Sequence, residues 1–349
     1  MISLLRHKPA SPIGVDLGTQ SLKLLQFDAQ REQLVAAMRW ETFEAGTTEA
    51  GASLSESLTQ AYRARPFRGR DAVICLRAPD LFVQNIRVPK VSPAQMDEAV
   101  YDEAQSRLPF PIEEAEIRYI AAADVRQGDE VRREVILLAC HQPVLDRTLK
   151  TIEEAGLRPV AVDIEPAALL RGYCRSFRRD ADQELTLMFV NVGGAHTVVV
   201  IARGSDLLFI KYLDIGGYQL DEAVASHLDM SIGDAAGLRR SLGERRSEER
   251  DPEIAATIKE ATRGLLDRLG QELSLCARYH SVAFRGQPID RVIIGGGEAS
   301  DHLVTAIDER VERPCELGNP LRGFQEADAP GRASQWDVAA GLAMREVQT

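Results

Sequence analysis

Two stretches of the chain repeat one pattern whose residue types suit anion binding. The first stretch runs from Ile13 to Ser21 and the second from Met188 to Thr197. Each reads as an apolar strand, a tight glycine turn and the start of a second apolar strand. A glycine turn lets backbone N–H groups approach an anion, because no Cβ stands in the way. Two such turns in related halves of a protein can hold a polyphosphate between them.

The two copies differ at one polar position that matters for chemistry. Asp16 in the first copy aligns with Asn191 in the second, and Gly18 aligns with Gly193 at the same offset. A carboxylate beside a phosphate turn can bind Mg²⁺ through water, as hard cations in phosphate sites prefer. Asp16 is therefore a candidate magnesium ligand, although an aspartate here is also compatible with a cap on its own turn.

A third glycine turn favours the same chemistry. Arg291 to Ile294 reads as a short apolar strand, Gly295 to Gly297 follow, and an apolar-periodic helix continues to Val311. A strand, a glycine turn and a helix N-terminus in this order commonly admit a nucleotide. A lone run of glycines would indicate only a turn. Three such turns, two of which form an internal repeat, indicate a nucleotide site.

The order and spacing of these turns resemble the actin-like ATPase superfamily. Over nearly its whole length, the chain is also similar to a narrower group, the PilM family of type IV pilus assembly proteins. The residues that carry this resemblance are Ile13–Leu25, Leu108–Glu114, Val162–Leu169, Asp214–Gly217, Ile293–Gly297, Gly318–Leu321 and Ala339–Ala343. The glycine turns alone are typical of any actin-like protein. The Leu-Pro-Phe-Pro segment and the closing Ala-Gly-Leu-Ala helix indicate the PilM family or a close paralogue.

The resemblance implies an α/β fold, in which two ribonuclease-H-like halves surround a nucleotide cleft. The first actin-like core is expected over residues 12–84, with continuations at 164–184 and 331–349. A small α/β subdomain of the FtsA and PilM type is expected as an insertion over 85–163. The second core is expected over 185–330, with a helical subdomain at about 218–287.

The resemblance also implies a site for ATP, with Mg²⁺ held by Asp16. The nucleotide-binding positions that it indicates are Gly18, Thr19, Gln20, Lys23, Gly193, Gly194, Ala195, Gly216, Gly217, Gly296 and Gly297. Lys23 is assigned to phosphate because related proteins place a lysine on the strand that returns from the first turn. A solvent-facing lysine at the sheet edge is the alternative. Glu222 and Lys259 are assigned to the base or ribose on position alone.

Two acidic residues lie where actin-like folds place a residue that positions the attacking water. These are Asp163 and Glu165, and either could act as a weak general base. Both are equally compatible with acids at a helix N-terminus that the helix dipole stabilises. No firm catalytic residue is therefore assigned.

Asn191 departs from the pattern of family members that hydrolyse ATP, which usually carry an aspartate at this position. Asparagine keeps the hydrogen bonds but lacks the negative charge that helps to hold Mg²⁺ and to orient water. His196 also replaces a small or hydroxyl residue in the second turn. We therefore expect nucleotide binding with weak or absent hydrolysis.

The inserted segment is expected to bind a protein partner. In PilM-like proteins a groove beside the inserted subdomain receives a short N-terminal peptide of PilN, a bitopic membrane protein. An extended peptide in such a groove would use strand-edge hydrogen bonds and apolar anchors. The expected wall residues are Phe82, Val83, Leu108 and Phe110, each of which could instead belong to a core turn.

The composition of the chain excludes some classes of partner and some cellular locations. The net charge of -11 and the aromatic content of 5% argue against nucleic acid as a partner. No apolar run approaches the ~20 residues that span a bilayer. The five cysteines show no metal-type spacing. The resemblance thus implies a cytoplasmic ATP-binding scaffold, peripheral to the inner membrane through a PilN-like protein, with self-association left open.

Two other functions stay open at this level. An ATP-dependent kinase of the same superfamily would need a substrate motif in the cleft, and no sugar-kinase-type motif is present. A filament-forming protein like FtsA would carry a basic amphipathic membrane helix at its end. The closing residues Met344 to Thr349 do not have that pattern, which disfavours this alternative.

Overall fold

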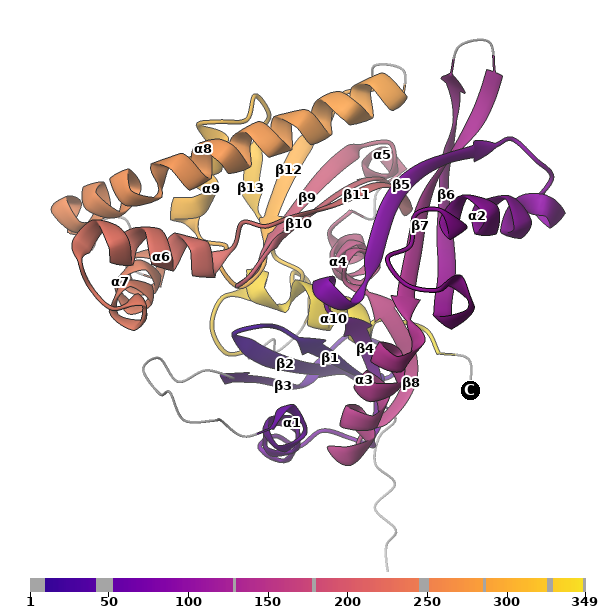
Figure 1. The fold of residues 1–349 in the computed structure, drawn as a ribbon. Helices are drawn as coiled ribbons and strands as arrows, with labels where there is room; N and C mark the ends of the chain where they lie inside the picture. The colour runs from indigo at the N-terminus through magenta and orange to yellow at the C-terminus, as the bar shows by residue number, and fades with distance from the viewer. Residues whose placement is uncertain are drawn as a thin grey trace, which may run out of the picture. The chain divides into compact units, whose positions relative to one another are not determined.

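The computed structural model describes residues 10–41, 53–127, 130–177, 180–244, 251–284, 287–324 and 329–347. These residues form two compact units, each built from separate stretches of the chain (Figure 1). The first unit combines residues 1–77, 146–176 and 319–349. The second combines residues 78–145 and 177–318.

The first unit is built on a five-stranded sheet with the strand order β3-β2-β1-β4-β8. Its strands are β1 (Ile13–Leu17), β2 (Ser21–Phe27), β3 (Leu34–Glu41), β4 (Asp71–Leu76) and β8 (Arg158–Ile164). The first three strands pair antiparallel, whereas β1, β4 and β8 run parallel. Residues 158–163, which the sequence analysis included in the inserted subdomain, therefore belong to a strand of this first sheet.

Helices cover both faces of the first sheet. They are α1 (Leu54–Arg63), α3 (Gln142–Glu154), α4 (Glu165–Tyr173) and α10 (Asp337–Ala343). Side chains alternate along each strand, so Ile13 and Val15 pack with α1 while Leu25 and Phe27 pack with α10. The alanine- and glycine-rich sequence of α10 lets this helix approach the sheet and α4 closely.

The second unit repeats this sheet topology. Its larger sheet has the order β11-β10-β9-β12-β13, again with three antiparallel strands followed by parallel ones. The strands are β9 (Thr186–Val192), β10 (Thr197–Arg203), β11 (Asp206–Leu213), β12 (Arg291–Gly295) and β13 (Cys315–Leu317). The same order of strands in both units confirms the two ribonuclease-H-like halves that the repeated glycine turns predict.

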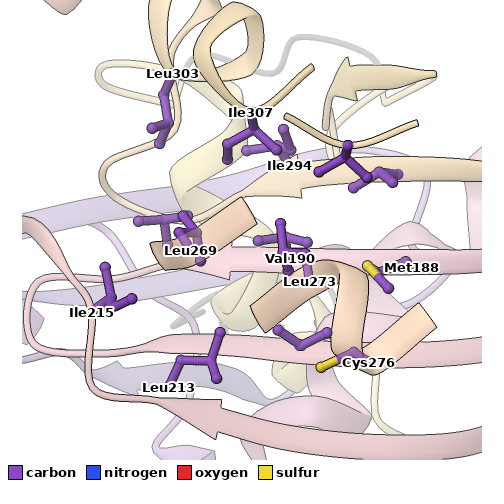
Figure 2. Close-up of a cluster of buried hydrophobic side chains, with 14 of the residues drawn as sticks. Met188, Val190, Leu213, Ile215, Leu269, Leu273, Cys276, Ile294, Leu303 and Ile307 are labelled. Carbon is purple, nitrogen blue, oxygen red and sulfur yellow. The ribbon is translucent and has the colours of Figure 1, made fainter. Parts of the chain in front are cut away.

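The main core of the second unit lies between this sheet and two helices. Figure 2 shows Met188 and Val190 of β9 facing Leu269 and Leu273 of α8, with Ile307 of α9 beside them. The helices of this unit are α2 (Met96–Gln105), α5 (Asp180–Gln183), α6 (Gly217–Leu228), α7 (Ile232–Glu244), α8 (Pro252–Ala283) and α9 (Asp301–Asp308). Every residue of β9 is buried, which explains its apolar run from Leu187 to Val190.

A smaller sheet with the order β5-β7-β6 also belongs to the second unit. Its strands are β5 (Phe82–Pro89), β6 (Ala115–Gln127) and β7 (Glu130–His141), and α2 packs on it. Glu134 of β7 is 1% exposed and accepts hydrogen bonds from Arg87 of β5 and Tyr279 of α8. Burial and this hydrogen bond raise the pKa of Tyr279 to about 12, so its hydroxyl remains a donor at neutral pH.

Candidate functional site

Three glycine turns of the second unit meet at one place. The backbone N–H of Gly217 donates to the carbonyl of Gly193 over 2.9 Å, and that of Tyr218 donates to Gly194 over 2.7 Å. The N–H of Glu298 donates to the carbonyl of Val192 over 3.0 Å. The turns after β9, before α6 and after β12 are therefore held together by main-chain hydrogen bonds.

This arrangement gathers the nucleotide-binding residues that the sequence assigns to the second half. They are Gly193, Gly194, Ala195, Gly216, Gly217, Gly296 and Gly297. The first three and Gly297 are partly exposed, whereas Gly216, Gly217 and Gly296 are buried beneath them. A surface made of backbone groups with few side chains is a suitable wall for a phosphate or a sugar.

Gly296 has a conformation that explains why glycine is required in the third turn. Its φ is +95°, a region that L-residues with a Cβ rarely adopt. A Cβ at this position would also lie 2.7 Å from the Val192 nitrogen and 2.8 Å from Asn191 Oδ1. After the turn, the Ser300 hydroxyl accepts a hydrogen bond from the Leu303 N–H and caps α9.

Asn191 occupies the same position in its sheet as Asp16 does in the other. Each is the penultimate residue of the central strand, β9 or β1, directly before the glycine turn. Asn191 is 4% exposed, and its side-chain oxygen is directed towards Gly296. Its neutral amide therefore packs between the second and third glycine turns.

The first unit carries the other predicted phosphate turn. Lys23 Nζ and Asp16 Oδ2 form an ion pair of 2.9 Å across the β1–β2 hairpin, close to Gly18. Burial alone would lower the pKa of Lys23, but the Asp16 carboxylate raises it above its ordinary value. Lys23 is thus a buried cation directed at the turn, and not the solvent-facing lysine of the alternative reading. Thr19 is exposed at the tip, with Gln20 beside it.

The acidic residues assigned to the attacking water lie at the carboxyl end of β8. The Asp163 carboxylate is 6% exposed and pairs with Arg171 at 3.0 Å and with Arg345 at 2.9 Å. Both arginines contact Oδ2, and Oδ1 accepts the Ile164 N–H over 2.8 Å, so both oxygens that a general base would use already have partners. Glu165 begins α4 and is partly exposed, so it is better placed than Asp163 to contact water.

One acidic residue that the sequence analysis missed lies in the same part of the first unit. Asp337 begins α10, is 1% exposed and accepts the Val338 N–H over 2.8 Å. Its pKa is raised to about 7, mainly by burial and to a smaller extent by the charges of Asp16 and Glu165, against the lowering effects of the Val338 N–H and of Lys23. No local sequence signal marks this residue, because only the packing of α10 buries it.

A buried ionic cluster in the second unit was also missed. Arg239 of α7 pairs with Asp221 of α6 and with Glu298 of the third glycine turn, each at 2.6 Å.

The two residues assigned to the base or ribose on position alone lie on the surface of the second unit. Glu222 is exposed on α6, and Lys259 of α8 is exposed and pairs with Glu309 at 3.1 Å.

The four residues assigned to a peptide groove all lie in the second unit. Phe82 and Val83 of β5 line a cavity of about 790 Å³. The other walls of this cavity come from β11 and α8. Phe82 and Leu108 both pack against the core formed by the small sheet and α2, and Phe110 stacks on His141 with ring centroids 5.2 Å apart.

Two edge strands line the cavity. β5 is an edge strand of the small sheet and β11 is an edge strand of the larger one. Asn85 Nδ2 donates to the Ile210 carbonyl over 2.9 Å, which joins the two edges at one point. Leu275 of α8 adds an apolar side chain that is 49% exposed.

A comparison with protein families decides the classification. The family model described as type IV pilus assembly protein PilM matches residues 14–347. The chain belongs to the PilM family. Residues 14–347 include both units and all the predicted site residues, so the family applies to the whole site.

Solved structures agree with the fold of this family. The chain is 23% identical to a chain of a PilM–PilN type IV pilus biogenesis complex, with a TM-score of 0.78 and coverage of 97% of this chain and 99% of that one. It is 13% identical to the ethanolamine utilization protein EutJ from Carboxydothermus hydrogenoformans, with a TM-score of 0.55 and coverage of 96% and 89%. The chain thus has the actin-like ATPase fold that the sequence resemblance implies.

The residues of this PilM-family chain are compatible with a nucleotide and one divalent cation. Within the second unit, the partly exposed glycine turns offer backbone groups to phosphate. Within the first unit, Lys23 offers a cation beside the turn at Gly18. Within the described residues, no group of three or more His, Cys, Asp or Glu side chains could hold a metal by itself.

None of the described helices combines the length and the apolar character that crossing a bilayer requires.

Proposed function

We propose that this PilM-family chain is an ATP-binding scaffold of a type IV pilus assembly platform, with weak or absent ATP hydrolysis. The observation that carries the proposal is the convergence of three glycine turns on one wall of the second unit. Within the first unit, Lys23 and Asp16 lie beside a further glycine turn, where an ammonium group suits phosphate and a carboxylate suits Mg²⁺. Bound Mg²⁺ would offset phosphate charge.

Weak hydrolysis follows from the chemistry of two positions. Asn191 has no charge with which to hold Mg²⁺ or polarise water, and its amide is buried against the third turn. Asp163 has its carboxylate occupied by two arginines. Glu165 remains as the one candidate for positioning water among the assigned residues, and general-base catalysis contributes typically 10²–10⁴-fold.

Calorimetry with Mg-ATP, together with phosphate release, tests this proposal. We expect the wild-type protein to bind Mg-ATP without turnover, and the Asn191→Asp variant to bind with slow turnover. Wild-type hydrolysis near the ~10 s⁻¹ that is typical of enzymes would contradict the scaffold assignment. Absence of binding in both proteins would reject ATP as the ligand.

The second part of the proposal is a PilN-like partner. A PilM–PilN complex is among the structures that this chain resembles, and the family belongs to type IV pilus assembly. The proposed contact is the cytoplasmic N-terminal peptide of a PilN-like inner-membrane protein, which would hold the chain at the membrane. Phe82, Val83, Leu108 and Phe110 remain the proposed wall residues.

Separate substitutions can show which wall residues the peptide uses. Val83→Asp places a charge in the cavity between β5 and β11, and Phe110→Ala removes the ring that stacks on His141. Val131→Ala on β7 is a control, because Val131 is 43% exposed and does not line the cavity. Weaker peptide binding in one test variant alone would identify the wall, and normal binding in both would reject the four residues.

A further inference from the structure

Three charged side chains form a buried cluster directly behind the glycine turns of the second unit. Arg239 lies on α7, Asp221 on α6 and Glu298 in the turn after β12. Their side chains are 12%, 3% and 4% exposed. The guanidinium contacts Asp221 Oδ1 and Glu298 Oε2 at 2.6 Å each, and Arg240 lies 3.8 Å from the second oxygen of Asp221.

The cluster also contacts the backbone of the site. Arg239 donates a hydrogen bond of 3.3 Å to the carbonyl of Gly217, the first residue of α6. The Glu298 side chain covers the α-carbon of Gly217 so closely that a Cβ there would overlap its carboxylate. Arg239 therefore connects the turn before α6 with the turn after β12, both of which are expected to hold the nucleotide.

Folding stability alone gives little reason for this arrangement. Burial of two carboxylates and a guanidinium costs desolvation energy that the ion pairs only partly offset, and apolar side chains of similar size are often as stable. Burial indeed raises the pKa of Asp221 in spite of the nearby Arg239. What the cluster provides beyond stability is geometry, since a planar guanidinium fixes several partners in direction as well as distance.

We propose that Arg239 is a positioning residue of the nucleotide site, which holds the Gly217 turn against the Gly297 turn. This inference rests on the proposed function, because it assigns Arg239 a role in ATP binding. Arg239 acts through Gly217 and Glu298 and need not touch the ligand. With the turns fixed in advance, less conformational entropy is lost when a nucleotide binds.

The test is an Arg239→Lys variant, which keeps the charge but not the planar fork of donors. Arg310→Lys is the matched control. Arg310 is similarly buried, at 15% exposure, and donates to Asp267 Oδ1 over 2.8 Å and to the Ala306 carbonyl. None of these contacts involves a glycine turn. We expect both variants to fold, with Mg-ATP affinity reduced roughly tenfold or more in Arg239→Lys alone.

Hydrogen exchange without nucleotide gives a second readout, independent of ATP. The Tyr218 and Glu298 amides, which donate to Gly194 and Val192, should exchange faster in Arg239→Lys than in wild type or Arg310→Lys. If the wild type binds Mg-ATP and Arg239→Lys binds it with the same affinity, the inference is overturned. If wild type binds no ATP, the proposed function fails, and the exchange rates still decide whether Arg239 holds the turns.

Discussion

At the scale of single residues, Asp337 has the clearest measurable consequence. Its pKa is raised from 3.8 to about 7, first by burial, so the folded chain keeps a proton that the unfolded chain releases. The unfolded state therefore binds fewer protons between these values, and stability falls as pH rises through this window. Below this pH window, the contribution of Asp337 to the stability of the fold is fully present.

We predict that Asp337→Asn removes this part of the pH dependence. Each pKa unit corresponds to about 1.4 kcal/mol. The difference in the free energy of unfolding between wild type and variant should therefore change by at most about 4 kcal/mol across this pH window. The measurement is urea-induced unfolding at about pH 5 and about pH 7.5. Asp146→Asn, at an exposed position, is the control. Parallel pH curves for wild type and Asp337→Asn would show that Asp337 is ionised in the fold.

At the scale of elements, close packing of α10 against α4 orders the first unit. A Cβ on Gly341 of α10 would overlap the carbonyl oxygen of Ala168 in α4. The backbones therefore approach each other to a distance that only glycine permits. Arg171 of α4 also donates to the Gly341 carbonyl over 2.8 Å, so separation of the helices would break a hydrogen bond as well.

We predict that Gly341→Ala lowers the free energy of unfolding by about 3 kcal/mol, at the upper end of typical overpacking costs. Gly264→Ala in the long helix α8 should instead raise the free energy of unfolding. No heavy atom lies within 4 Å of a Cβ built on Gly264, and alanine in a helix interior is favoured over glycine by about 0.5–1 kcal/mol. Thermal unfolding of both variants checks the pair. A stable Gly341→Ala protein would mean that α10 and α4 separate at little cost.

At the scale of the whole molecule, the proposed scaffold has to relate nucleotide binding to partner binding. A ligand shifts a conformational equilibrium only if it binds the two states with different affinity. By linkage, ATP and a PilN-like peptide would then change each other's affinity by the same factor.

We predict that the affinity of the PilN-like N-terminal peptide differs with and without saturating Mg-ATP. Typical coupling free energies correspond to roughly 5–150-fold, which titration of a labelled peptide would resolve. The Arg239→Lys variant at low nucleotide concentration serves as the matched comparison. Equal peptide affinity in both conditions would leave a scaffold whose two ligands bind independently.

Sequence patterns were sufficient for features that depend on neighbouring residues. The strands beside Gly18, Gly193 and Gly296 and the turns themselves could be predicted, because glycine requirements and apolar alternation are local. The internal repeat then predicted the matching sheets, in which Asp16 and Asn191 are equivalent. The Leu-Pro-Phe-Pro segment and the closing Ala-Gly-Leu-Ala helix then indicated the PilM family before any geometry was known.

Only the tertiary structure decided which distant side chains meet. Arg345 neutralises Asp163 from 182 positions further along the chain, Arg239 reaches Glu298, and α10 buries Asp337. Strand β8 joined the first sheet by parallel pairing with β4, which no local pattern specifies. The physical reason is that ionisation and desolvation depend on all the groups around a buried charge. The sequence by itself therefore determined where a nucleotide could bind, whereas packing decided which carboxylates are free to act on it.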